Sequence, residues 1–164
     1  ILRSLFDRTL FVLARAVCVA APAGLILWAM ANIPAGNGTL FTAFSSLLDP
    51  LGRLLGMDGI ILTGFILGFP ANEIVLPIIL MGYLQTGVLA ELAEPAALME
   101  LFTARGWTLQ TLLCTAVFCL FHWPCSTTCL TIKKETGSLR WTAVSILLPT
   151  LIGCILCFLI QILL

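Results

Sequence analysis

Long stretches without any charged side chain constrain the fold of this chain more than any motif does. Asp, Glu, Lys and Arg are missing over residues 16–48, 74–90, 107–132 and 141–164. A helix needs about 20 predominantly apolar residues to cross a bilayer, and three of these runs are longer than that. Charged residues make up only 10% of the chain, against about 25% in a soluble domain. The pattern predicts an all-α integral membrane protein, with residues 1–164 forming one domain in a lipid bilayer.

The charge pattern and the motif inventory exclude several functions. The formal net charge is zero, and no Lys/Arg cluster is interleaved with stacking aromatic residues, so no nucleic-acid partner is expected. No GxxxxGK[ST] phosphate loop occurs, and no motif pairs a nucleophile with a general base, so the chain is not expected to be an enzyme. The seven cysteines are odd in number and lie in or beside apolar segments, unlike the cysteines of a disulfide scaffold.

Three apolar segments are predicted to cross the membrane. The first runs roughly over residues 10–33, after an amphipathic approach helix, and "NIPAGNGT" stops it. The other two begin at Trp107 and Trp141. The sequence "KKETGSLR" between them carries three bases and one acid, so this loop is expected on the cytoplasmic side. An amphipathic interfacial helix over residues 40–56, broken at Pro50, is expected after the first crossing.

Residues 59–90 are predicted to form a re-entrant or broken-helix hairpin that enters and leaves the membrane on one side. Its first part, up to Pro70, has twelve residues and would be about 18 Å long as a helix. Its second part, from Ile74 to Ala90, has seventeen residues and would be about 26 Å long, with Pro77 inside it. Both are short for about 30 Å of hydrocarbon. If Arg3 and Arg8 lie on the cytoplasmic side together with the basic loop, the first crossing emerges outside and the hairpin must return outside.

Two stretches share an order of aromatic residue, proline, polar cluster and apolar residues: "FPANEIVL" at 69–76 and "WPCSTTCL" at 123–130. Proline is favoured in the first turn of a helix and disfavoured inside one. Both stretches are therefore predicted to be helix breaks, with Pro70 and Pro124 at the start of the new helix and Pro77 as a further interruption. Irregular backbone at membrane depth requires protein or water to satisfy its polar groups, and transporters build ion or substrate sites at such breaks.

The polar residues after the two breaks form the candidate site. Glu73 is functional by default because a carboxylate between apolar runs is expensive to bury, although it would also suit the first turn of a helix. Cys125 and Cys129 are four residues apart, so a helix places both sulfurs on one face, where they could bind a metal or simply pack. Residues expected to line the same polar cavity are Asn72, Ser126, Thr127, Thr128 and His122. His122 could also be a ligand or an interface residue, and the sequence alone favours packing for it.

Three long stretches of the chain resemble the C-terminal membrane region of the ferrous iron transport protein B family. They are "DRTLFVLARAVCVAAPAGLILWAMANI", "LLDPLGRLLGMDGIILTGFILGFPANEIVLPIILMGYL" and "FHWPCSTTCLTIKKETGSLRWTAVSILLPTLIG". The resemblance implies a multi-pass protein of the bacterial inner membrane that carries Fe²⁺ as its transported ion and holds no permanent cofactor. It matches the cysteines of the family's iron path to Cys125 and, less directly, Cys129, and the Asn-Glu pair of its Gate motif to Asn72 and Glu73.

The resemblance also implies partners. Residues 1–164 would be a piece of a longer transporter, holding the second of two Gate (nucleoside-recognition-type) repeats. The first Gate repeat and a GTP-binding domain would belong to the rest of that protein, and assembly into homo-oligomers is compatible with the sequence. Two other functions stay open: a Gate-type permease for a nucleoside or another organic solute, and a membrane scaffold without transport. Thiols at Cys125 and Cys129 favour the ion, because a nucleoside site has no special need for them.

Overall fold

The computed structural model describes residues 2–92 and 94–164, without the side chains of residues 2–8, 11 and 15. This part of the chain is helical apart from its connections and one small antiparallel pair of strands, so the predicted all-α class is confirmed. In chain order the elements are α1 (Leu2–Asn32), β1 (Pro34–Ala35), β2 (Gly38–Thr39), α2 (Leu40–Leu54), α3 (Gly59–Leu67), the 3-10 helix η1 (Asn72–Ile74), α4 (Val75–Leu84), α5 (Pro95–Ala104), α6 (Leu109–Phe121), α7 (Ser126–Thr136) and α8 (Leu139–Leu163).

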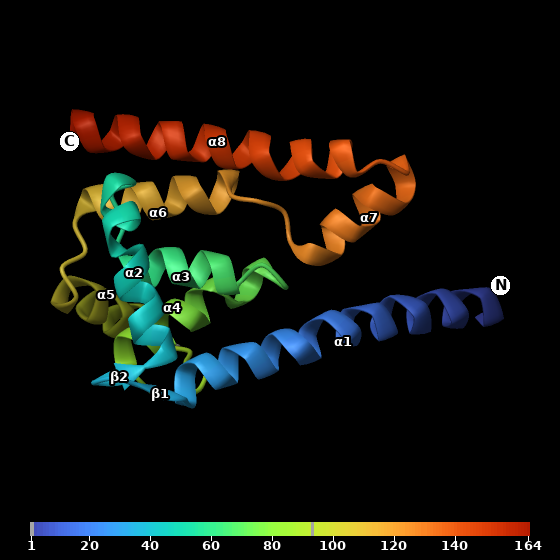
Figure 1. The fold of residues 1–164 in the computed structure, drawn as a ribbon, viewed down its shortest axis with the longest axis horizontal. Helices are drawn as coiled ribbons and strands as arrows, with labels where there is room; N and C mark the ends of the chain where they lie inside the picture. Colours follow the sequence, from blue (N-terminus) through green and yellow to red (C-terminus); the bar gives the residue numbers. More distant parts are fainter. Residues whose placement is uncertain (1, 93) are drawn as a thin grey trace.

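Three stretches of the described chain are long and apolar enough to cross a membrane. They are Val12–Asn32 in α1, Leu109–Thr136 across α6 and α7, and Leu139–Leu163 in α8. Figure 1 shows α1, α6 and α8 running lengthwise through the molecule, with the α7–α8 turn at one end and the C-terminus at the other. These are the three crossings that the sequence predicts, and the second contains a break in its middle.

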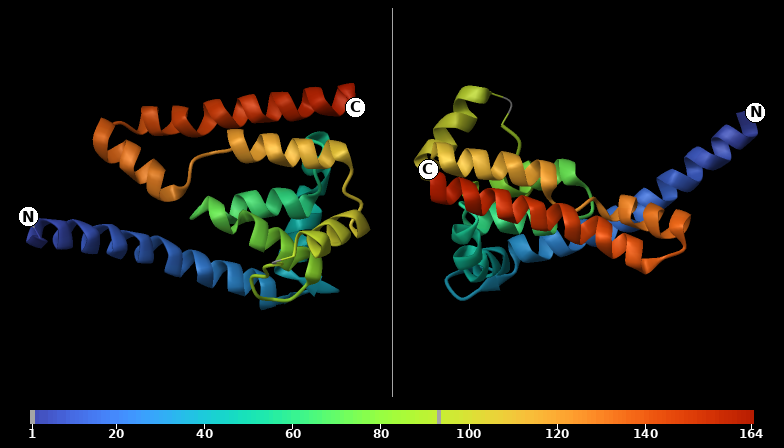
Figure 2. Two further views of the ribbon diagram at one scale, coloured as in Figure 1. Left: turned by 180° about the vertical axis from the view of Figure 1, so that it is seen from behind. Right: turned by 90° about the horizontal axis from the view of Figure 1, so that it is seen from above.

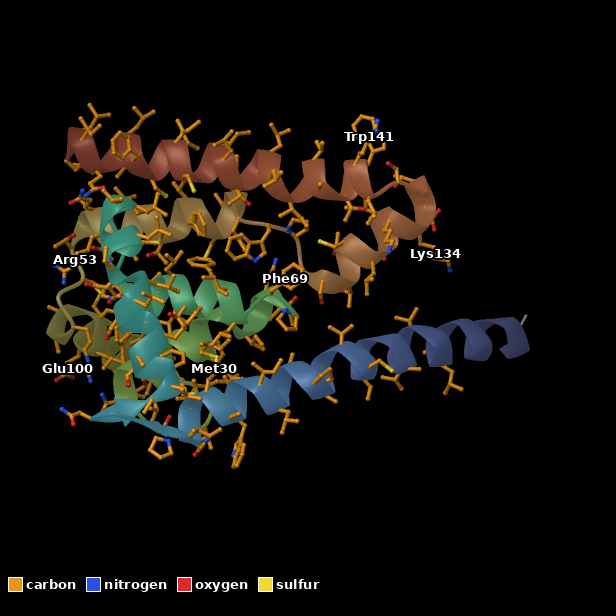
Figure 3. All side chains as sticks on the ribbon, viewed as in Figure 1. Met30, Arg53, Phe69, Glu100, Lys134 and Trp141 are labelled. Atoms are coloured by element: carbon orange, nitrogen blue, oxygen red, sulfur yellow. The ribbon has the colours of Figure 1, made fainter. Side chains whose placement is uncertain are left out.

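Helices α3 and α4 form the predicted hairpin. They pack against each other, and the left view in Figure 2 shows them between α1 and the pair α6 and α8. The buried core joins Phe65 of α3 and Ile79 of α4 to Phe118 of α6. In Figure 3 the labelled Lys134 lies at one end of the molecule and Arg53 at the other, where the hairpin opens. The hairpin therefore opens at the end of the molecule that lies away from the basic loop.

Helix α2 corrects the prediction of a break at Pro50. The helix continues through Pro50 to Leu54, and the chain then turns by 107° into α3. Pro50 lies near the end of the helix, so its missing N–H removes a single backbone hydrogen bond. The close packing of α2 on α3 stabilises the helix by more than the lost hydrogen bond costs. The two backbones are in contact there, because Gly59 lies directly against the carbonyl oxygen of Ser45. The helix expected at the membrane interface is therefore the first member of a bent helix pair, and α3 is the second.

The prolines at the two helix breaks lie earlier than predicted. Pro70 precedes Ala71, which is the N-cap residue of η1, and Pro124 precedes Cys125, which is the N-cap residue of α7. Each proline therefore stands just outside the new helix, at the same position in both breaks. Pro77 lies in the first turn of α4 and does not interrupt it. The N–H groups of a first turn have no partner in the helix, so a proline there costs no hydrogen bond.

The open end of the hairpin is held by Tyr83, whose side chain is buried. Its hydroxyl donates to Asp58 Oδ2 at 2.5 Å and accepts from Trp107 Nε1 at 2.7 Å. The Arg105 guanidinium donates to the Tyr83 carbonyl oxygen. The other carboxylate oxygen of Asp58 caps α3 by accepting from the Ile61 N–H at 2.7 Å. One side chain thus connects the start of α3, the end of α4 and the segment before α6.

Tyr83→Phe is expected to lower the free energy of unfolding by about 1–3 kcal/mol, because Asp58 and Trp107 each lose a hydrogen-bond partner. Reversible unfolding of the purified protein in mixed detergent micelles would measure the change. Thr103→Val is the matched control, since the exposed Thr103 hydroxyl bonds only to Met99 O of its own helix. Equal stability of Tyr83→Phe and the control would contradict a role for this contact in holding the hairpin.

Candidate functional site at two helix breaks

The two helix breaks meet in space. The first break comprises residues 68–71, between α3 and η1, and the second comprises residues 122–125, between α6 and α7. The backbone N–H of Ser126 donates to Phe69 O at 2.8 Å, and the Ser126 hydroxyl donates to Pro70 O at 3.4 Å. Figure 3 shows Phe69 at the tip of the hairpin, next to the start of α7. We call this contact the junction.

The junction satisfies backbone groups that the breaks set free. Where α3 ends, its last carbonyl groups have no partner within the helix, and the first N–H groups of α7 are in the same position. The Ser126 N–H and the Phe69 carbonyl satisfy each other. Irregular backbone at membrane depth is stable only when protein or water supplies such partners. Because Ser126 lies near the middle of the second candidate crossing, the junction also lies near the middle of that crossing.

The first break is followed by the two predicted polar residues. Asn72 begins η1 and is half-buried, and its Oδ1 atom is buried without a hydrogen-bond partner in the described chain. Glu73 is exposed. The ion pair found among the described residues joins Arg53 to Asp49, so Glu73 has no ion-pair partner there. An amide and a carboxylate without an ion-pair partner among the described residues thus directly follow the contact with α7.

The second break places a thiol at the start of α7. Cys125 is the N-cap residue, and its Sγ lies 3.2 Å from Thr127 Oγ1 and 3.1 Å from Thr128 Oγ1. Cys129 is buried one turn later, with its Sγ directed at Pro124 O at 3.4 Å. The first turn of α7 therefore holds a half-buried thiol, a buried thiol and three hydroxyl groups, counting that of Ser126.

His122 ends α6 and contacts the hairpin. Its Nδ1 lies 3.1 Å from Phe118 O and 2.9 Å from Cys119 O, and its ring packs on Phe65 of α3 with centroids 5.1 Å apart. Its Nε2 and the neighbouring Trp123 Nε1 are buried without partners among the described residues. The buried polar nitrogen of Trp123 is a feature of the site that was not predicted from the sequence. The position of this tryptophan directly before the proline of the second break was the available signal.

The predicted metal-ligating residues do not form a closed site. In the part of the chain that the structure describes, no three His, Cys, Asp or Glu side chains gather into a group that could hold a metal ion. The remaining cysteines of the core serve packing, since Cys114 and Cys157 are fully buried and each thiol faces the carbonyl oxygen of the other residue.

A cleft separate from the junction lies at the open end of the hairpin, between α1, the strands, α2 and α4. Its volume is about 530 Å³. Its polar lining is uncharged and consists of amide and hydroxyl side chains: Asn37, Thr39, Thr42, Ser46 and Gln85. None of the predicted site residues lines this cleft.

Comparison with known proteins places the chain in a family. The family model Gate, described as nucleoside recognition, matches residues 13–139, a range that includes the hairpin, both breaks and all the predicted site residues. No curated protein and no solved structure matches the chain. Because the match covers most of the sequence, this membrane protein belongs to the Gate family of transporter-type domains.

Proposed function

We propose that the chain forms part of the membrane permease of a ferrous iron transporter, and that Fe²⁺ passes through the junction. The observation that carries the proposal is the direct contact between the two breaks, through Ser126 and Phe69, near the middle of the second candidate crossing. Around that contact stand an exposed carboxylate without an ion-pair partner in the described chain and two thiols. A broken helix with polar side chains at this depth is the construction that transporters use for ion sites.

The chemistry of the side chains fits a borderline divalent cation. Fe²⁺ accepts thiolate, imidazole and carboxylate ligands. Moving it through hydrocarbon without ligands would be prohibitive, because an isolated charge is very costly to desolvate. Glu73, Cys125 and Cys129 would serve as successive ligands. Ligands that act in succession hold the ion weakly enough for it to leave, which a conducting path requires. The side chains proposed to line the path beside them are Asn72, Ser126, Thr127, Thr128 and His122.

The choice of Fe²⁺ rests on the resemblance to ferrous iron transport protein B. Under this proposal, the first Gate repeat and a GTP-binding domain complete the transporter, and the bacterial inner membrane is its location. Nucleotide hydrolysis would take place in that separate domain. The membrane domain would contribute half of the ion path, with Pro70 and Pro124 ending the helices so that backbone groups become available at the junction.

The proposal predicts that iron uptake depends on residues of both breaks. Glu73→Gln, Cys125→Ser and Cys129→Ser are each expected to lower the initial rate of radio-iron uptake about tenfold, the loss typical of one weakened charged or soft ligand (about 1.4 kcal/mol per factor of ten). The full-length protein would be expressed at matched membrane abundance in a strain without other ferrous uptake. Cys18→Ser, an exposed thiol on α1, is the matched control and should transport like the wild type.

Wild-type uptake in all three variants would exclude the ligand role and would mean that these residues serve helix packing.

A second candidate function is supported by the uncharged polar cleft at the open end of the hairpin. Its volume falls within the range of small-molecule sites, which is about 300–1,000 Å³. A permease for a nucleoside or another neutral solute would take up labelled nucleoside, and its activity would not respond to the cysteine substitutions.

A further inference from the structure

Hydrogen bonds fix the tautomer of His122, the single histidine in the sequence. The Nδ1 atom lies within hydrogen-bond distance of two backbone carbonyl oxygens, those of Phe118 and Cys119. Carbonyl oxygens only accept, so Nδ1 must carry the hydrogen. In a neutral imidazole the other nitrogen, Nε2, then has a free lone pair.

Packing alone does not account for an imidazole at this position. The Nε2 atom is buried and has no partner in the described chain. The ring lies among Phe65, Phe118 and Trp123, with centroid distances of 5.1, 6.2 and 6.0 Å. A buried acceptor without a partner is destabilising, because it has lost its hydrogen bond to water and gained none from the protein. An aliphatic or phenyl side chain would fill the same space among these rings without that cost, so the lone pair points to a ligand.

The geometry of His122 is that of a metal-binding histidine. Such residues donate one ring N–H to a backbone carbonyl or carboxylate, which fixes the tautomer and orients the other nitrogen toward the metal. We propose that Nε2 of His122 is a direct ligand of the divalent transition metal that crosses the junction. The inference rests on the proposed function and adds a nitrogen ligand to its path.

Two other potential donor atoms belong to residues at the two breaks, Asn72 Oδ1 and Cys125 Sγ. Asn72 Oδ1 is the second buried acceptor without a partner at the breaks, and it belongs to the segment that Ser126 holds against α7. Cys125 lies three residues after His122 in the second break, whereas Asn72 follows the first break. Nitrogen, oxygen and sulfur donors together suit a borderline ion such as Fe²⁺. The ion would pass from one donor to the next with water completing its coordination, which fits the lack of a closed three-ligand group in the described chain.

Nitrogen NMR of the histidine tests the proposal directly. The full-length protein would be labelled with ¹⁵N-histidine and placed in nanodiscs, and the His122 signals would be assigned as those absent from His122→Asn. Without metal, the spectrum should show a protonated Nδ1 and a bare Nε2. Zn²⁺, a diamagnetic probe, should shift the Nε2 resonance and leave Nδ1 protonated, and Fe²⁺ should compete with it. A hydrogen on Nε2, or no shift at saturating Zn²⁺, would overturn the proposal.

Two substitutions separate the ligand role from the structural role of the ring. In His122→Asn the amide N–H can take the place of Nδ1–H at the carbonyl oxygens, but the Nε2 lone pair is lost. This variant should keep the wild-type melting temperature and lose about tenfold in iron uptake. His122→Gln places an amide oxygen near the Nε2 position and should retain part of the uptake.

The combined outcomes distinguish this inference from the proposed function. Wild-type uptake by His122→Asn, together with impaired uptake by Cys125→Ser, would leave the iron path in place and remove His122 from it. Absence of iron uptake by the wild-type protein would reject the proposed function. In that case the effect of Zn²⁺ on Nε2 in the wild-type spectrum would still decide whether His122 binds a metal.

Discussion

Gly59→Ala is expected to destabilise the protein by more than about 3 kcal/mol and to remove most of the folded material from detergent extracts. A Cβ atom at this position would lie 1.9 Å from Ser45 O and 2.8 Å from Asp49 N, both of which are backbone atoms of α2. Overpacking costs about 1–3 kcal/mol where side chains can move aside, and more where they cannot. Here the obstacle is helix backbone, so α2 and α3 must separate.

Separation of α2 from α3 would also break two polar contacts. The Gly59 N–H donates to Asp49 Oδ1 at 3.1 Å, and the buried Ser45 hydroxyl donates to Thr63 Oγ1 at 3.0 Å. Thermal unfolding followed by size-exclusion chromatography would measure the loss. Gly24→Ala is the matched control, because a Cβ there meets no atom within 4 Å. In the interior of α1 it should be neutral or stabilising by up to about 1 kcal/mol. Similar melting temperatures for the two variants would contradict the close crossing.

The membrane spans and the hairpin could be predicted because length and hydropathy determine them. A hydrophobic run either reaches across the bilayer or does not, and the two parts of residues 59–90 fall short. The helix through Pro50 could not be predicted, since the contact that stabilises it is tertiary. Gly59 is fourteen residues away from Ser45 in the sequence, and only their contact shows that α2 lies directly on α3.

The prediction that Pro70 and Pro124 lie in the first turn of the new helices was wrong because of the capping residue at each break. The preference for proline in a first turn is correct for Pro77, which lies in the first turn of α4. In the two breaks the cap residue stands between the proline and the helix, so Pro70 and Pro124 end the preceding segment instead. The choice between these positions depends on where the first helical hydrogen bond forms, which composition alone does not determine.

The meeting of the two breaks was anticipated from their shared residue order, but its atoms were not. The contact uses the backbone of Ser126 and Phe69, and any residue except proline carries the same N–H donor. Side-chain chemistry therefore gave no signal for it. The role of Glu73, Cys125 and Cys129 as ligands along an ion path stays a prediction, and the described residues hold no group of three or more His, Cys, Asp or Glu side chains that could bind a metal ion. The Cys125 thiol instead lies against the hydroxyls of Thr127 and Thr128 in its own helix.

Ser126→Pro is expected to open the junction while leaving α7 intact, with a loss of roughly five- to hundredfold in transport. Ser126 is the first residue of α7, where proline is favoured in helices. Cys125, the residue before it, already has φ −60° and ψ 158°, the extended conformation that a following proline requires. The backbone N–H is lost, and with it the 2.8 Å hydrogen bond to Phe69 O.

A carbonyl left without its partner at this depth costs about 1–3 kcal/mol, which is the free energy behind the expected loss in transport. Uptake by the full-length protein would be measured together with helix content by circular dichroism, which should not change. Ser126→Ala is the matched control. It keeps the N–H and removes the hydroxyl, with its long 3.4 Å contact to Pro70 O and its place in the proposed path lining, where Thr127 and Thr128 still supply hydroxyls, so it should change uptake much less than Ser126→Pro does. If Ser126→Pro transports like the wild type, contact between the two breaks is not needed for conduction, and the path must run along one break alone.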